Sequence, residues 1–267
     1  MALTALTITA LGAGWTTLSA QPASPPVAAA RPGLVAGYLS RGGAPSSLAL
    51  VPPPPTAGSS AQARDDDGAK AAVALHGTPR WDLATQDADL SFPNAAGTFS
   101  CALGVPVTEA ATPKLYQLLR RTLADFGLST YPTKTKYQRA RPFTVNGAPM
   151  CTPALDAGLR KDGSYPSGHA AIGWGWALVV AEVDPERAEA ILARGRAFSE
   201  SRMICNVHWA SDVEEGRTMA SATAAKLHAQ AEFRADVEAA RAEVAAVRAQ
   251  GLAPNRDCAK EAAQLAR

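Results

Sequence analysis

The spacing of apolar residues in the second half of the chain predicts helices. Apolar side chains recur there every three or four residues, which places them on one face of a helix. One helix is expected to begin at Thr112-Pro113 and to end at Tyr131-Pro132, because proline suits the first turn of a helix and interrupts its interior. Its apolar face comprises Leu115, Leu118, Leu119 and Leu123.

A strongly apolar segment near the middle of the chain predicts a central helix. It begins at Gly168 or His169 and runs to about Val183, where Asp184-Pro185 ends it and begins the next helix. Two tryptophans alternate with glycines in this segment, which favours close packing of the helix in the core. These residues are Gly173, Trp174, Gly175 and Trp176.

Two further helices are expected toward the C-terminus. Ser211, followed three residues later by Glu214, is a capping-box pattern and predicts the start of one helix. The alanine-rich segment 233–250 is amphipathic, and Gly251 follows it as a stop signal. We find no run that alternates polar and apolar residues as a strand does. These patterns predict an all-α fold, a single-domain helical bundle over residues 37–267.

The N-terminal part has a different character. Residues 1–20 carry no charge and read as a signal peptide, although the usual basic residue near the start is absent. Residues 21–36 are rich in Pro and Ala and are expected to form a flexible leader. The run 52–55 is all proline and should lie extended before a helix that begins near Ser59 or Ser60. We therefore expect a periplasmic or secreted protein.

The presence of four cysteines is typical of a protein from an oxidising compartment. Their even number permits two disulfides with three possible connectivities, and the sequence does not choose among them. They are widely spaced and lack the paired spacing of a zinc site, so no metal site is expected. The four residues are Cys101, Cys151, Cys205 and Cys258.

Composition narrows the classes of partner. The 267 residues are 47% hydrophobic and 19% charged, which is ordinary for a globular protein. The net charge is +2, and no block of Lys and Arg indicates a nucleic-acid or anionic-membrane surface. Apolar segments after the leader are too short to span a bilayer, so no membrane insertion is expected. Small molecules are the expected partners; the apolar helices also allow a homodimer, for which the sequence indicates no interface.

The first cluster of candidate functional residues is cationic. It contains Lys134, Arg139 and Arg141, the last followed by Pro142. Taken alone, such a cluster is usually a solvated face. Arg139 and the neighbouring Tyr137 lie inside this cluster and could support its functional residues, but we favour their interpretation as packing residues.

The second cluster is the turn-forming stretch 163–169, which leads directly into the apolar central helix. Its last residues, Ser167, Gly168 and His169, fall at the helix N-terminus, where backbone N–H groups favour an anion. The alternative interpretation is an ordinary serine N-cap followed by a histidine in the first turn.

The third cluster contains Ser201-Arg202, then His208 and Asp212. A carboxylate four residues after a histidine near a helix start can accept a hydrogen bond from the imidazole and fix its tautomer. The other ring nitrogen is then free to act as a base or nucleophile. The remaining histidines, His76 and His228, match no motif and are interpreted as structural.

Together the three clusters resemble the signature of the phosphatidic acid phosphatase type 2 superfamily. Within it the chain looks like the bacterial class A non-specific acid phosphatases, which are exported, soluble and helical. The resemblance covers roughly residues 37–267. The residues that carry it are Lys134 and Arg141-Pro142, then Pro166-Ser167-Gly168-His169, then Ser201-Arg202, His208 and Asp212.

The resemblance implies a phosphomonoesterase of broad specificity that needs neither metal nor cofactor. His208 would attack phosphorus and form a phosphohistidine, Asp212 would orient it, and His169 would act as general acid. Activity should be bell-shaped in pH, with a mildly acidic optimum. The phosphate-binding residues would be Lys134, Arg141, Ser167, Gly168 and Arg202.

Two other functions share this signature or its fold. In vanadium haloperoxidases, vanadate occupies the phosphate position and the residue equivalent to His208 ligates it, although those chains tend to be larger. An exported phosphate-binding protein with an inactive site is the alternative from another class, but it would have lost the nucleophile or the acid, and both are present here.

Overall fold

The computed structural model describes Met1, residues 34–40 and residues 42–266. The expected signal peptide, 1–20, lies outside the described residues except for Met1, and so does the leader, 21–36, except for residues 34–36. The polypeptide from residue 34 leads to Tyr38 and Leu39, whose backbone N–H groups donate to the carboxylate of Asp125 over 2.9 and 3.0 Å.

Every regular element among the described residues is helical, which confirms the all-α prediction. Three short 3-10 helices, Ala95–Phe99, Pro153–Leu155 and Pro185–Arg187, lie between the α-helices. The α-helices are α1 (Ser47–Leu50), α2 (Ser60–Val73), α3 (Pro79–Asp87), α4 (Ser100–Leu103), α5 (Pro113–Leu128), α6 (Tyr131–Tyr137), α7 (Pro142–Asn146), α8 (Asp156–Leu159), α9 (Gly168–Val183), α10 (Ala188–Ile204), α11 (Ala210–Leu227), α12 (Ala231–Ala249) and α13 (Cys258–Leu265).

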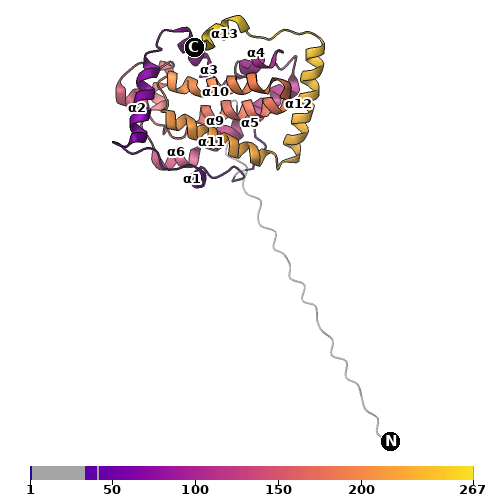
Figure 1. The fold of residues 1–267 in the computed structure, drawn as a ribbon. Coiled ribbons are helices and arrows are strands. Elements are labelled where there is room, and N and C mark those ends of the chain that lie inside the picture. Colours follow the sequence, from indigo (N-terminus) through magenta and orange to yellow (C-terminus); the bar gives the residue numbers. More distant parts are fainter. Residues whose placement is uncertain (2–33, 41, 267) are drawn as a thin grey trace.

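Helix α9 is the centre of the molecule and packs against α5, α10 and α11 (Figure 1). Its glycines allow this approach. A Cβ atom on Gly173 would lie 2.0 Å from the Phe198 ring of α10, and one on Gly175 would lie 2.4 Å from the Phe126 ring of α5. Trp176 is fully buried and donates its indole N–H to the carbonyl of Leu119 over 3.0 Å. The predicted packing role of this segment is confirmed.

Outer helices cover this centre. Figure 1 shows α2 at one end, α12 at the opposite end and α13 along one side. Helix α12 packs on α5 through buried Phe233, Val237 and Val244, while α2 lies against the first turns of α11 and the end of α10. The N-termini of α9 and α11 and the C-terminus of α10 consequently come together near α2.

Two disulfides join distant parts of the chain. Cys101 and Cys258 link α4 to α13, and Cys151 and Cys205 link the segment after α7 to the end of α10. The expectation that the four cysteines form two disulfides is confirmed. The structure also gives the connectivity, one of three possibilities among which the sequence could not choose.

Helix starts were predicted with mixed success. Ser59 caps α2 by accepting from the Gln62 N–H, as expected. The capping box at Ser211 is wrong, because α11 begins at Ala210. The Ser211 hydroxyl instead donates to Asp65 over 2.6 Å, and Asp212 caps the helix by accepting from the Trp209 N–H over 2.9 Å.

The two histidines outside the motifs make ordinary contacts. The His76 ring packs edge-on against Trp81 at 4.7 Å between centroids. His228 lies 3.2 Å from Glu182 and packs edge-on against Phe233. Tyr137 likewise packs edge-on against Tyr165, as its predicted packing role requires.

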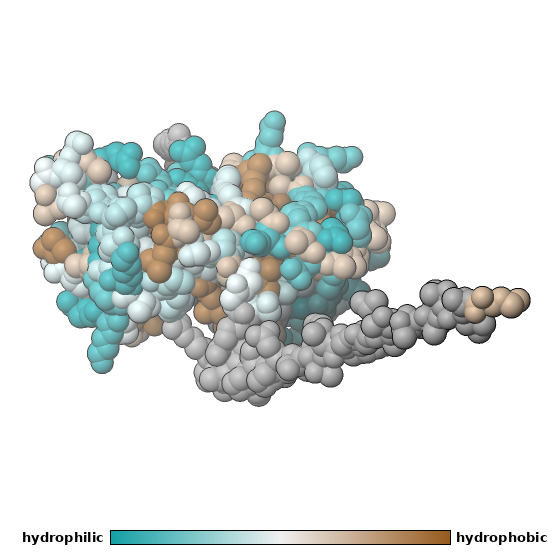
Figure 2. Space-filling view, turned by 90° about the horizontal axis from the view of Figure 1, so that it is seen from below, coloured by the Kyte–Doolittle hydropathy of each residue, from teal (hydrophilic) through white to brown (hydrophobic). Residues whose placement is uncertain are grey.

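The face of the molecule drawn in Figure 2 carries mostly hydrophilic residues. On the face shown in Figure 2, apolar residues form small separate groups among hydrophilic ones. Among the described helices, none is long and apolar enough to cross a membrane.

Candidate active site

His208 lies just before α11 with both ring nitrogens engaged. Its Nδ1 lies 3.2 Å from Asp212 Oδ2, and its Nε2 lies 3.0 Å from Arg141 Nη1. A guanidinium can only donate, so Nε2 must accept and the proton of the neutral ring lies on Nδ1, toward Asp212. The ring is 3% exposed. Burial and then the charge of Arg141 lower the pKa of His208 well below its usual value.

Two residues that the sequence interpretation did not assign to the site also hold Asp212. The Ser164 hydroxyl donates a short hydrogen bond to Oδ2, and Arg139 Nη1 lies 2.7 Å from Oδ1. The ion pair of Arg139 with Asp212 favours the supporting role that the sequence left open over the packing role that we favoured. The sequence signal for the supporting role is the position of Arg139 inside the first cluster, close to Arg141.

Lys134 and Arg141 are buried cations whose donors point at backbone carbonyls. Lys134 Nζ donates to Gly163 O over 2.5 Å, and burial followed by the charge of Arg141 lowers the pKa of Lys134 to about 8. Arg141 donates to Leu159 O and Val207 O and pairs with Asp162 at 3.0 Å. Asp162 lies 3.7 Å from Lys134 Nζ, so one carboxylate faces two cations.

Arg202, near the end of α10, differs from the other two cations. It is 1% exposed, and its Nε and Nη1 atoms are buried with no hydrogen-bond partner among the described residues. Burial followed by the charge of Arg141 lowers the pKa of Arg202 to about 9. A buried charge without partners is costly, so this guanidinium indicates a place for an anion.

The turn before α9 lies against the start of α11. Ser167 accepts from the Ala170 N–H over 3.2 Å and caps α9, and the Ser167 N–H donates to Asp212 O over 2.8 Å. Gly216 of α11 permits this approach, since a Cβ there would lie 2.5 Å from Ser167 O. Gly168 is the first residue of α9, where backbone N–H groups have no acceptor within the helix. The N-cap and the anion-binding interpretation of this segment are therefore compatible.

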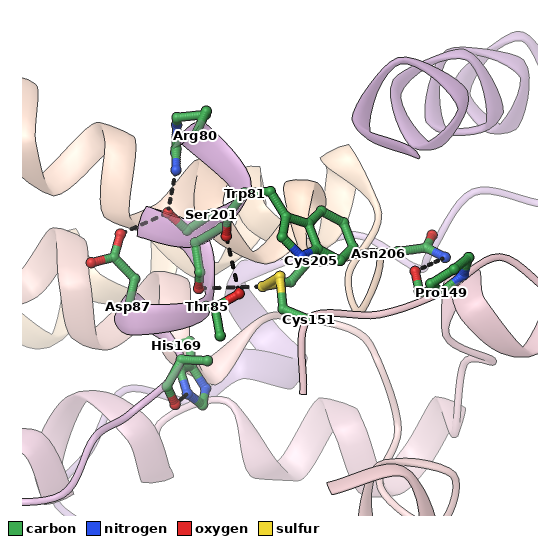
Figure 3. The surroundings of a disulfide bond; sticks show 12 residues. Arg80, Trp81, Thr85, Asp87, Pro149, Cys151, His169, Ser201, Cys205 and Asn206 are labelled. Carbon is green, nitrogen blue, oxygen red and sulfur yellow. Dashed lines mark hydrogen bonds between the residues drawn. A yellow bond between two sulfur atoms is a disulfide. The ribbon is translucent and has the colours of Figure 1, made fainter. Parts of the chain in front are cut away.

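His169 lies in the first turn of α9, next to the C-terminal end of α3. Figure 3 shows it on the side of α3 that carries Thr85 and Asp87. Its Nε2 lies 3.1 Å from Ala88 O; a carbonyl only accepts, so Nε2 carries a proton. Burial and then the charge of Arg202 lower the pKa of His169 well below its usual value. Burial and this charge thus favour a neutral His169 ring.

Comparison with known proteins gives the family. Residues 116–235 match the model of the PAP2 superfamily. A non-specific acid phosphatase of Providencia stuartii is 40% identical over 209 residues, which are 78% of this chain and 84% of the relative. An acid phosphatase of Zymomonas mobilis subsp. mobilis is 43% identical over 191 residues, 72% of each chain. A non-specific acid phosphatase of Salmonella typhimurium is 38% identical over 181 residues, 67% of this chain and 72% of the relative.

The chain belongs to the non-specific acid phosphatases of the PAP2 superfamily. The resemblance inferred from the three motif clusters is confirmed. Acid phosphatases are phosphoric monoester hydrolases, so the expected enzyme class follows from the family.

In this acid phosphatase chain, the motif residues from α6, α9, α10 and α11 form one group. Arg141 contacts His208, and Ser167 contacts Asp212 through the backbone. The charge of Arg202 acts on both His169 and His208, and that of Lys134 acts on His208. The sequence reasoning missed Asp162, which directly precedes the turn-forming stretch and could be recognised only by its contacts with the cations.

Proposed function

We propose that this acid phosphatase is an exported enzyme that hydrolyses a broad range of phosphate monoesters through a phosphohistidine on His208. The observation that carries the proposal is the buried guanidinium of Arg202, which has unpartnered donors beside Arg141 and the imidazole of His208. A phosphoryl group between these side chains would give Arg202 its missing acceptors.

Phosphate binding is assigned to three cations and the N-terminus of α9. Lys134, Arg141 and Arg202 would balance the charge that spreads over the equatorial oxygens during transfer. The Ser167 hydroxyl, which accepts from Ala170, still has its own proton to donate, and the Gly168 N–H adds a further donor. Such a site would supply the positive charge without a metal ion, and we propose that turnover needs none.

The nucleophile is Nε2 of His208. The lowered pKa of His208 keeps this nitrogen unprotonated in mildly acidic solution, and Asp212 holds the ring proton on Nδ1. Nε2 would leave its contact with Arg141 and form a bond to phosphorus while the bond from phosphorus to the ester oxygen breaks.

The departing alkoxide needs a proton, which we assign to His169. Because burial and the charge of Arg202 lower the pKa of His169, this proton must arrive with a substrate monoanion or be taken up on binding. Nε2 donates to Ala88, so Nδ1 would carry the transferred proton. The neutral His169 would then accept a proton from the water whose oxygen attacks phosphorus, while the bond between phosphorus and His208 breaks and inorganic phosphate leaves.

Export is proposed from the N-terminal sequence together with the disulfides. Residues 1–20 have the pattern of a signal peptide, and both cysteine pairs are oxidised. The experiment for this part is expression in a bacterium with assay of the periplasmic fraction. Activity found only in the cytoplasm, with free thiols, would contradict it.

The decisive experiment on the mechanism is hydrolysis of an aryl phosphate by the purified protein in excess chelator. We expect turnover that vanadate inhibits, and denaturation during turnover of 32P-labelled substrate should trap acid-labile label on the protein. His208→Ala should abolish both turnover and label. Loss of turnover in chelator would contradict metal independence, and absence of phosphatase activity with halide oxidation in added vanadate would favour the haloperoxidase alternative.

A further inference from the structure

Buried ion pairs of Arg139 lie behind the hydrogen-bonded pair of His208 and Asp212. Arg139 Nη1 lies 2.7 Å from Asp212 Oδ1, and Arg139 Nη2 lies 2.7 Å from Asp65 Oδ2 on α2. Both carboxylates are completely buried, and the Arg139 side chain is 9% exposed. The guanidinium thus bridges two carboxylates from helices that are far apart in the sequence.

The two oxygens of Asp212 have different partners. Oδ1 receives Arg139, whereas Oδ2 receives the Trp209 N–H at 2.9 Å, the Ser164 hydroxyl and Nδ1 of His208. An aspartate carboxylate can turn about the bond that carries it, so a partner fixed on one oxygen determines where the other points. Arg139 therefore controls the position of the oxygen that orients the imidazole.

Asp65 completes the arrangement and holds α2 against the start of α11. It accepts from the Ser211 N–H at 2.8 Å and from the Ser211 hydroxyl at 2.6 Å, as well as from Arg139. Arg139 also donates to Gln62 on the same helix at 2.9 Å. The two carboxylates and one guanidinium leave a single net negative charge behind His208.

We propose that Arg139, balanced by Asp65, is a positioning residue that holds Oδ2 of Asp212 on Nδ1 of His208. This role rests on the proposed function, because it concerns the orientation of the nucleophile in that reaction. Among the described residues, no hydrogen bond or ion pair joins the side chain of Arg139 or Asp65 to Lys134, Arg141 or Arg202, so both would act through Asp212.

The first test separates turnover from anion binding. Arg139→Gln should lower kcat about 10- to 100-fold, because a side chain that orients a reacting group typically has an effect of this size. The inhibition constant of inorganic phosphate should change by less than about threefold, since the three cations that would bind it remain. Asp65→Asn added to Arg139→Gln should recover part of the lost kcat, because it removes the carboxylate that had lost its counter-charge.

The second test uses the pH profile of kcat/KM, in which the charge that is removed determines the direction of the shift. Removing the cation in Arg139→Gln makes protonation of His208 easier, so the acidic limb of kcat/KM should move to higher pH by roughly half a unit to one unit. Asp65→Asn alone removes a negative charge and should move that limb to lower pH. The charged groups around His208 are Lys134 on α6, Arg141 before α7, Arg202 on α10 and Asp212 on α11, with Asp162 beyond Arg141 and Asp65 beyond Arg139. His169 on α9 is the other titratable group that faces His208.

Two further variants distinguish a positioning effect on kcat from a loss of folding. Arg139→Lys keeps a charge but cannot bridge both carboxylates, so it should fold and still show a reduced kcat. Arg248→Gln breaks a different ion pair, with Asp184, and should change thermal stability only. Unchanged kcat and pH profile in all Arg139 and Asp65 variants, with only a lower melting temperature, would overturn the inference.

A spectroscopic measurement keeps this inference separate from the proposed function. The chain has four histidines, so 15N labelling of histidine allows the Nδ1 signal of His208 to be followed without turnover. That signal should shift in Arg139→Gln and stay unchanged in Arg248→Gln. If the shift appears but His208→Ala still hydrolyses substrate, the proposed mechanism fails, and what stands is that Arg139 orients the His208 ring through Asp212. If the signal stays unchanged in Arg139→Gln, the positioning role is wrong.

Discussion

Asp162 should limit how strongly the proposed phosphate site holds an anion. Its carboxylate pairs with Arg141 and faces Lys134, and its side chain is 39% exposed. Asp162→Asn should free both cations and lower the inhibition constant of inorganic phosphate about two- to fivefold, the range expected for a partly solvated charge. Competitive inhibition measured at two salt concentrations tests this. Asp156→Asn, which breaks a neighbouring surface pair with Arg160, should have no effect; weaker phosphate binding in Asp162→Asn would mean that Asp162 mainly positions Arg141.

His169 should matter most for substrates with poor leaving groups. As the proposed general acid, it protonates the departing oxygen, and an alkoxide needs that proton far more than a nitrophenolate does. His169→Asn should lower kcat/KM by about 10²- to 10⁴-fold for an alkyl phosphate and by much less for p-nitrophenyl phosphate. Parallel assays of the two substrates measure the difference. An equal loss for both would assign His169 to phosphate binding instead.

At the scale of residues, the motif positions could be predicted because their spacing is encoded locally. Ser167 and Gly168 share one turn with His169, and the four-residue interval between His208 and Asp212 brings both side chains to one helix end. The sequence left a supporting role for Arg139 open but could not identify its partner Asp65, which lies 74 positions away in the sequence and meets Arg139 only through the packing of α2 on α11.

At the scale of elements, the connection between α10 and α11 determines how His208 lies relative to Arg202 in the last turn of α10. Asn206 in this connection has a φ of 58°, and its side-chain amide donates to Asn146, Ala148 and Pro149. Figure 3 shows Asn206 next to Pro149, with the Cys151–Cys205 disulfide close to Trp81. Cys205 lies midway between Arg202 and His208 in the sequence, so this disulfide fixes the segment that carries both groups.

The two disulfides should therefore differ in their effect on activity. Removing the Cys151–Cys205 bond by alanine substitution should lower the free energy of unfolding by about 4 kcal/mol for its separation of 54 residues, and removing Cys101–Cys258 by about 5 kcal/mol for 157 residues. Only the first change should also lower kcat/KM, by about tenfold, because it loosens the segment that carries His208, the proposed nucleophile. Urea unfolding and kinetics on folded protein measure both effects; an equal kinetic loss from the second disulfide would contradict this assignment.

Helix boundaries were predicted correctly where the local sequence contains strong start and stop signals. Helix α9 runs from Gly168 to Val183 as predicted, since a glycine-containing turn precedes it and Asp184-Pro185 follows it. The start of α11 was missed because the Ser211 hydroxyl serves a tertiary contact with Asp65 instead of a cap. Local sequence can propose a cap but contains no information about a partner on another helix.

For the molecule as a whole, the helical class could be predicted, but the assembly could not. Periodicity identified helices and excluded strands, whereas the disulfide connectivity depends on which distant segments meet. Gly173 and Gly175 indicated that other helices approach α9 closely, because glycines in a helix permit contacts that a Cβ would prevent. Their partners, Phe198 and Phe126, gave no comparable sequence signal.

The stability of the whole protein should fall in acid unless an anion fills the site. The folded protein holds the pKa values of His169 and His208 well below their usual value, whereas unfolding returns them to about 6.5. Below about pH 6.5 the unfolded chain therefore binds more protons than the folded one, and the free energy of unfolding decreases as the pH falls toward the folded pKa values.

Inorganic phosphate should reverse part of this loss. Its negative charge beside both rings favours their protonation, so binding should take up protons and become more stabilising as the pH falls. We expect phosphate to raise the melting temperature more at pH 5 than at pH 7.5. The double variant His169→Asn and His208→Asn controls for the titration of other groups, and in it the extra gain at pH 5 should shrink. An equal or larger gain at pH 7.5 in the unsubstituted protein would show that proton uptake by these histidines is not coupled to anion binding.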